Sequence, residues 1–136
     1  MGHALQEIHR VLIPGGLLLD IRPFGGTTPL EVVRDGRAQT AGYFDESTDH
    51  PDDVAANNAV SRAVRRGRFH RERDGEFRFS YYWDTVDEMR AYVKEKWTAT
   101  RLPGSVSRKA RRLMAPGDGR LRATVTVIIT RLRKVG

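Results

Sequence analysis

Apolar residues recur at helical spacing at the start of the chain. From Ala4 to Leu12 they fall three or four positions apart, so they share one face of a helix. Pro14-Gly15-Gly16 is expected to end this helix, because proline cannot continue it and glycine accepts a positive φ. The apolar run Leu17–Ile21 follows directly, which is typical of a strand buried on both faces in a parallel sheet.

The middle of the chain contains turn and helix signals. Leu30–Phe44 is expected to form a small hairpin turning at Asp35-Gly36, or else a short helix starting at Pro29. A second helix is predicted from Asp49, where proline and acidic residues occupy the first turn. Gly67 is expected to end that helix.

The second half of the chain alternates strand and helix patterns. Phe69–Trp83 is typical of a hairpin with an Asp74-Gly75 turn. Thr85 then caps a helix, with Glu88 three residues later in the position of a capping box. Ser105–Met114 predicts a further helix.

The chain ends in a predicted long strand, in which Leu121, Ala123, Val125, Val127 and Ile129 alternate with polar residues.

These elements indicate an α/β fold in a single domain over residues 1–136. Its three main strands are expected at Leu17–Arg22, Phe77–Trp83 and Leu121–Arg133, in a mixed sheet flanked by helices. A chain of 136 residues is long enough for one ordinary core.

The composition excludes several kinds of functional site. The chain has no cysteine, which excludes disulfides, thiolate metal sites and cysteine nucleophiles. The four histidines show no ligand spacing, so no metal site is expected. The chain has no stretch of 18 apolar residues, so no membrane span is expected. Without a recognisable export signal, the expected location is the cytoplasm.

The net charge of +7 comes from 24 basic and 17 acidic residues. The densest basic run places Arg62, Arg65 and Arg66 on one helical face. This face is a candidate for binding a nucleic acid or another polyanion, which would make the chain a basic oligomeric binding module. The preferred interpretation is a solvated helix end, where cations favour the helix dipole.

The stretch Ala4–Gly16, which reads ALQEIHRVLIPGG, resembles the late signature of class I S-adenosylmethionine-dependent methyltransferases of the type 11 kind. In that family an apolar helix leads through Arg-Val-Leu, one variable residue and Pro-Gly-Gly into a buried strand. Ile13 occupies the variable slot. The match is close over about the first 21 residues and continues only as an order of elements.

The resemblance implies an incomplete Rossmann-like methyltransferase fold, of which this chain is the carboxyl-terminal half. The last strand would run antiparallel, between the strand from Leu17 and the strand from Phe77. The family holds S-adenosylmethionine with a glycine-rich loop after its first strand and an acid ending its second. Neither precedes Ala4, so the chain alone is expected to bind no cofactor and to be inactive.

Two origins remain open: Met1 is an internal methionine of a longer protein, which is preferred, or the chain is a remnant with another role.

Substrate contacts are expected where the buried strand ends and in the aromatic group further along. The resemblance places the loop of Arg22 and Phe24 toward the methyl acceptor, with Arg22 orienting a polar or anionic group. The preferred interpretation of Arg22 is nevertheless a surface arginine that ends the strand. Tyr81 is a candidate wall of the same pocket, although such aromatic clusters more often belong to the core. No catalytic residue is assigned, and the methyl acceptor cannot be named from the sequence.

The last expectation concerns partners. Without the preceding half of the fold, the strand Leu17–Ile21 would expose one edge with unpaired backbone groups and apolar side chains. A homodimer or higher oligomer is expected to cover that edge.

Overall fold

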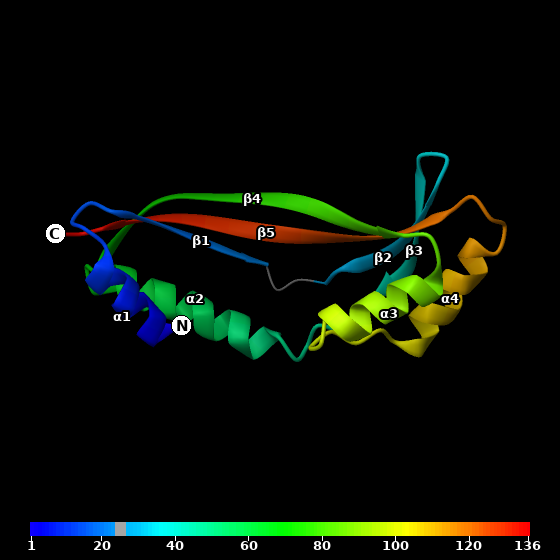
Figure 1. Cartoon of the computed structure of the whole chain (residues 1–136), viewed down its shortest axis with the longest axis horizontal. Helices are drawn as coiled ribbons and strands as arrows, with labels where there is room; N and C mark the ends of the chain where they lie inside the picture. The colour runs from blue at the N-terminus through cyan, green and yellow to red at the C-terminus, as the bar shows by residue number, and fades with distance from the viewer. Residues whose placement is uncertain (24–26) are drawn as a thin grey trace. The chain divides into compact units, whose positions relative to one another are not determined.

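The computed structural model describes residues 1–23 and 27–136 of the chain. Within these residues, helices and strands alternate in a mixed α/β arrangement (Figure 1). The helices are α1 (Gly2–Val11), α2 (His50–Arg65), α3 (Val86–Lys96) and α4 (Gly104–Met114). The strands are β1 (Leu17–Pro23), β2 (Pro29–Arg34), β3 (Arg37–Tyr43), β4 (Phe69–Trp83) and β5 (Arg120–Lys134).

The five strands belong to one open sheet in which β5 is the central partner. β5 pairs antiparallel with β1 through its second half and antiparallel with β2 through its first half. β3 pairs with β2, and β4 pairs with β5. The prediction of an α/β fold is confirmed in this coarse form. The mixed sheet that the sequence predicts is wrong, because the strand pairs β1–β5, β2–β5 and β2–β3 are all antiparallel.

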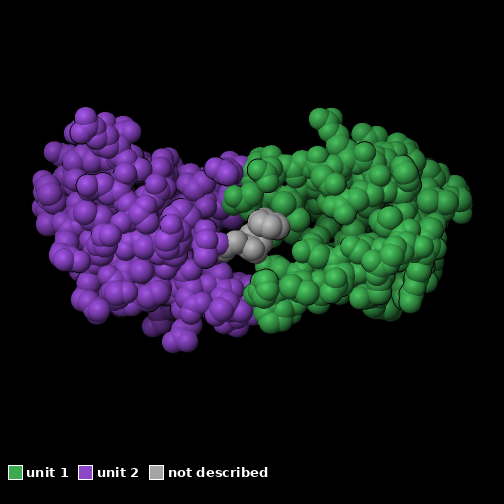
Figure 2. All heavy atoms as spheres, turned by 180° about the vertical axis from the view of Figure 1, so that it is seen from behind, with its two compact units in different colours: residues 1–24, 50–77, 126–136 green, residues 25–49, 78–125 purple. Residues whose placement is uncertain are grey.

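The chain divides into two compact units, which Figure 2 colours separately. Unit 1 comprises residues 1–24, 50–77 and 126–136, and unit 2 comprises residues 25–49 and 78–125. The long strands β4 and β5 contribute residues to both units.

Unit 1 places α1 and α2 against one face of its strands. Leu5 of α1, Phe69 of β4 and Leu132 of β5 are buried together, and Ala59 and Val60 of α2 complete the contact. Leu18 of β1 packs against the same cluster. Leu5, Ile8 and Leu12 of α1 therefore face the core as their spacing predicts, whereas Ala4 and Val11, which the same spacing predicts on that face, are exposed.

Unit 2 places α3 and α4 against the β2–β3 hairpin and the adjoining ends of β4 and β5. Its core includes Leu30, Val32, Met89, Ala110 and Leu121, which are all nearly inaccessible to solvent. The hairpin turns at Asp35 and Gly36, whose φ angles of 51° and 72° are those of a tight two-residue turn. The alternative of a short helix from Pro29 is wrong.

The predicted hairpin in Phe69–Trp83 is also wrong, because β4 is one continuous strand. Gly75 does not adopt a positive φ. Asp74 accepts hydrogen bonds from Arg71 and from the Thr130 hydroxyl of β5. A turn at Asp74-Gly75 would interrupt the pairing of β4 with β5 and leave backbone groups of β5 without partners. The continuous strand is therefore the more stable arrangement.

The first strand is not buried on both faces, as its apolar run predicts. Leu17, Leu19 and Ile21 are exposed, at 45%, 56% and 54% of their possible area. Only Asp20 in β1 is fully buried. The reason is that, among the described residues of unit 1, helices cover one face of β1 only.

The buried positions of β5 also change along the strand. Leu121, Ala123 and Val127 are buried as their alternation predicts, but Thr130 and Leu132 are buried in place of Ile129. Thr130 is satisfied there by its hydrogen bond to Asp74, which lets a polar residue occupy the interior.

Candidate functional site

A polar pocket in unit 1 contains the predicted substrate residue Arg22. We call it the Arg22 pocket; its volume is about 570 Å³. Its polar lining comes from Arg22 of β1, Asn57 and Ser61 of α2, and Arg71 and Glu76 of β4. Val60, Asp74 and three consecutive residues of β5, from Ile128 to Thr130, also line it.

Arg22 is held in place by two neighbours. Its Nε and Nη2 atoms donate to the Asp20 carboxylate at 2.8–3.0 Å, and Nη2 also donates to Asn57 Oδ1 at 3.0 Å. Asp20 and Arg22 are two residues apart in a strand and therefore share a face. The Asp20 carboxylate is almost fully buried, and the charge-assisted pair satisfies it.

The opposite wall of the pocket is fixed by a second ion pair. Arg71 donates to Asp74 Oδ1 at 2.7 and 2.9 Å, and the Thr130 hydroxyl donates to the same oxygen at 3.0 Å. The hydrogen bonds from Arg71 are the main reason that the pKa of Asp74 lies below its usual range, with burial opposing the shift. Asp74 is therefore a carboxylate near neutral pH.

These pairings define what the pocket can bind. Both arginines have carboxylate partners, so the pocket is polar without a strong excess of either charge. Ser61 and Asn57 add neutral hydrogen-bonding groups beside apolar side chains. The arrangement suits an uncharged polar molecule better than the anionic substrate that the sequence also allows for Arg22.

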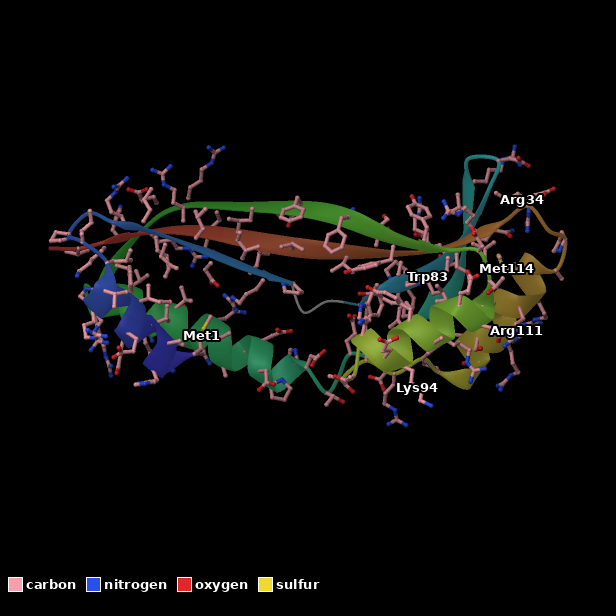
Figure 3. The ribbon with its side chains drawn as sticks, viewed as in Figure 1. Met1, Arg34, Trp83, Lys94, Arg111 and Met114 are labelled. Carbon is pink, nitrogen blue, oxygen red and sulfur yellow. The ribbon has the colours of Figure 1, made fainter. Side chains whose placement is uncertain are left out.

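The other predicted substrate residues lie elsewhere. Phe24 is outside the described residues. Tyr81 belongs to unit 2, where its ring contacts Trp97 at 5.1 Å and Tyr92 at 5.7 Å between ring centres. Trp83 joins the same cluster on the side of β4 that α3 covers (Figure 3).

The placement of this cluster agrees with core packing. The pKa of Tyr81 is raised by burial and, in addition, by the charge and hydrogen bond of Tyr92. Tyr82 points to the other face, where Arg120 lies 5.0 Å from its ring centre. The structure therefore separates Tyr81 from Arg22 into different units, and a substrate contact by Tyr81 stays a prediction.

The predicted polyanion face is partly assembled into a groove. Arg62 and Arg66 line a groove of about 280 Å³ between α1 and α2, together with Arg68 and His3. Arg65 is exposed on the same helix but does not line the groove.

Gly15 and Gly16 shape the turn between α1 and β1. Gly15 has a φ of +73°, which the turn after α1 requires. A Cβ on Gly16 would lie 2.8 Å from the Ile13 carbonyl oxygen, so its lack of a side chain serves the turn itself. Gly25 and Gly26 lie outside the described residues.

The described residues contain neither a cluster of metal ligands nor a helix that could span a membrane. No group of three or more histidine or acidic side chains lies close enough together to hold a metal ion. None of the described helices is both long and apolar enough to cross a membrane.

Sequence reasoning missed several residues of both cavities. The pairing of Asp20 with Arg22 follows from their spacing in a strand and could have been found. Asn57 is 35 positions from Arg22, and its contact depends on how α2 packs. The same holds for His3 in the groove between α1 and α2.

Comparison with known proteins adds no relative. The chain matches no protein-family model, no curated protein and no solved structure.

Proposed function

We propose that this chain is the carboxyl-terminal half of a class I S-adenosylmethionine-dependent methyltransferase fold. It would take part in methyl transfer only together with a cofactor-binding half. The observation that carries the proposal is the uncovered apolar face of β1, formed by Leu17, Leu19 and Ile21. An antiparallel strand with one solvated face normally carries polar residues there. An apolar face is expected where a second layer of helices covers the sheet.

The arrangement of unit 1 supports the same proposal. The helix before β1 and the helix after it, α1 and α2, pack together on one face. The last strand, β5, pairs with β1 on one side and with β4 on the other, and it runs antiparallel to β1. The resemblance of Ala4–Gly16 implies this placement for the final strand.

Within this proposal the Arg22 pocket holds the polar part of the methyl acceptor. Methyl transfer depends mainly on aligning the acceptor with the methyl group, so a pocket of fixed side chains is a suitable contribution. Asp20 and Asn57 hold the Arg22 guanidinium, which limits its rotation. The residues that hold the cofactor are proposed to lie in the other half of the fold.

The same uncovered face leads to a proposal about assembly. In the absence of a covering layer, two copies of the chain would bury Leu17, Leu19 and Ile21 against each other. β1 has β5 as its paired strand among the described residues, so its other edge can also accept a strand. The isolated chain is therefore proposed to form a homodimer.

The methyltransferase proposal is tested by calorimetric titration with S-adenosylmethionine. The titrant is added to this chain and, separately, to the protein translated from the reading frame extended upstream of the Met1 codon. Saturable binding is expected only for the extended protein. Micromolar binding by this chain alone would contradict the assignment of the cofactor site to another segment. An in-frame stop codon directly before Met1 would contradict the proposal as a whole.

A further inference from the structure

The groove between α1 and α2 concentrates positive charge on one side of unit 1. We call it the basic groove: Arg62, Arg66 and Arg68 line it from the α2 side, and His3 and Gln6 line it from α1. Its remaining lining residues are small or apolar, and no acidic residue is among them. A ligand in this groove would meet guanidinium groups above a floor of Leu5, Ala59 and Ala63.

Local backbone geometry brings the three arginines together. Arg62 and Arg66 are four residues apart, so they lie on the same face one turn apart. Gly67 then adopts a φ of +69°, and the Arg68 amide bonds back to the Ala63 carbonyl at 3.1 Å. The Arg68 carbonyl accepts from the Val135 amide at 3.1 Å, which fixes the position of the returning chain.

These arginines differ from most other arginines of unit 1 in their partners. Arg22, Arg71, Arg131 and Arg133 each form an ion pair with a carboxylate. No ion pair between described residues includes Arg62, Arg66 or Arg68. The cations of the basic groove are thus not neutralised within the described part of the chain.

The helix dipole accounts for only part of this arrangement. It favours cations in the last turn of α2, where Arg62 and Arg65 lie. It gives no reason for Arg68, which follows the helix, to line the same groove. Guanidinium groups that converge without carboxylates match phosphate oxygens in charge and in hydrogen-bonding geometry.

We infer that the basic groove binds the phosphodiester backbone of a nucleic acid without reading its sequence. The groove is lined by three arginines, a number that suits several phosphates better than a single one. It has no phenylalanine, tyrosine or tryptophan in its lining, so a base would have no such ring to stack on. The net charge of +7 adds a general attraction to the same partner.

The test is fluorescence anisotropy with a labelled 20-base-pair DNA duplex and a labelled single-stranded RNA, at several salt concentrations. Three phosphate contacts predict a slope of log K against log salt of about −2.7 for the duplex, or about 40-fold weaker binding at 200 mM than at 50 mM salt. The variant with Arg62, Arg66 and Arg68 all changed to Gln should lose at least 10-fold in affinity at 50 mM salt and most of this slope. Circular dichroism at the same temperature checks that it is folded.

A matched variant separates the groove from bulk charge. Arg108→Gln, Lys109→Gln and Arg112→Gln together remove the same charge from exposed positions of α4. This control should keep its affinity within about threefold. An equal loss in both triple variants, or no binding at 50 mM salt, would overturn the inference. Displacement of the labelled duplex by ATP at equimolar phosphate would also overturn it, since it would indicate a site for free nucleotides.

If the triple groove variant does not fold, Arg66→Gln and Arg66→Lys replace it. The lysine variant should bind more tightly than the glutamine variant, and equal affinity of the two would count against the groove.

Discussion

Leu19 lies directly opposite Arg131 in the antiparallel pairing of β1 with β5, on the sheet face that the described helices of unit 1 leave open. One position away, Leu18 lies opposite Leu132 on the covered face. Leu18 and Leu19 are neighbours in sequence, but Leu18 packs against the core of unit 1 and Leu19 lies on the open face of the sheet. Leu132 is inaccessible to solvent, whereas Leu19 is 56% exposed.

This difference predicts unequal effects on stability. Leu132→Ala should lower the free energy of unfolding by about 2–5 kcal/mol, because it leaves a cavity in the core of unit 1. In the monomer, where no second copy covers this face, Leu19→Thr should change it by less than about 0.5 kcal/mol, since an exposed position on a strand tolerates a β-branched polar residue. Urea unfolding followed by circular dichroism measures both. A similar loss in the two variants at a dilution that gives monomers would mean that Leu19 is buried within a single chain, which contradicts the open face of β1.

Gly42 in β3 is predicted to be intolerant of any side chain. A Cβ at this position would lie 2.6 Å from Cγ2 of Val106 in α4, and the φ of Gly42 is +142°. Gly42→Ala should therefore lower the free energy of unfolding by about 1–3 kcal/mol through overpacking and backbone strain. In the Gly42→Ala variant, a second change of Val106→Ala should relieve the overpacking between the two side chains. It should not relieve the backbone strain at residue 42. Additive losses in the double variant, measured by urea unfolding, would show that the two residues do not meet.

Thr85 is predicted to stabilise the start of α3. Its Oγ1 accepts a hydrogen bond from the Glu88 amide at 3.1 Å. Thr85→Ala should cost about 1 kcal/mol, the usual value for losing such a cap, and should lower the melting temperature. Thr98→Ala serves as the control, because Thr98 is exposed and lies outside the helix. If Thr98→Ala lowers the melting temperature as much as Thr85→Ala, the Thr85 cap does not stabilise α3.

Acid stability should depend on Glu72. Hydrogen bonding from Arg133 is the main reason that its pKa lies below the usual value; burial opposes this effect, and the charges of Arg133 and Arg131 add to it. A folded-state pKa below the unfolded value of about 4.3 contributes stability above that pH, and this contribution is lost as the pH falls through the folded pKa. Glu72→Gln should therefore be less stable than the parent chain at pH 7.

The stability gap between Glu72→Gln and the parent chain should narrow below about pH 4. Urea unfolding at pH 7, 5, 4 and 3 measures it. Glu95→Gln is the control, because the ion pair of Glu95 with Lys96 is exposed and contributes little. A gap that stays constant down to pH 3 would contradict the assigned role of Glu72.

Two Asp-Gly pairs show how far the sequence predicts this fold. Asp35-Gly36 and Asp74-Gly75 carry the same local signal for a tight turn, and only the first forms one. The second is held extended by contacts with Arg71 and with Thr130, which lies 56 positions away. Local chemistry predicted the cap at Thr85 and the turn at Asp35-Gly36, while pairing with a distant strand decided the conformation at Asp74-Gly75.

The candidate site shows the same limit. Arg22 was found because it follows an apolar strand, and its partner Asp20 follows from alternation along that strand. The Asn57 contact and the meeting of His3 with Arg62 in the basic groove depend on the packing of α2, which no local pattern specifies.

The central claim is that the open face of β1 is a contact surface rather than a solvated one. Multi-angle light scattering of the isolated chain at micromolar concentration tests it most directly. We expect a dimer for the parent chain and a monomer for the folded variant carrying Leu17→Thr, Leu19→Thr and Ile21→Thr, because the variant removes the exposed apolar side chains. A parent chain that is a clean monomer across this range would contradict the claim.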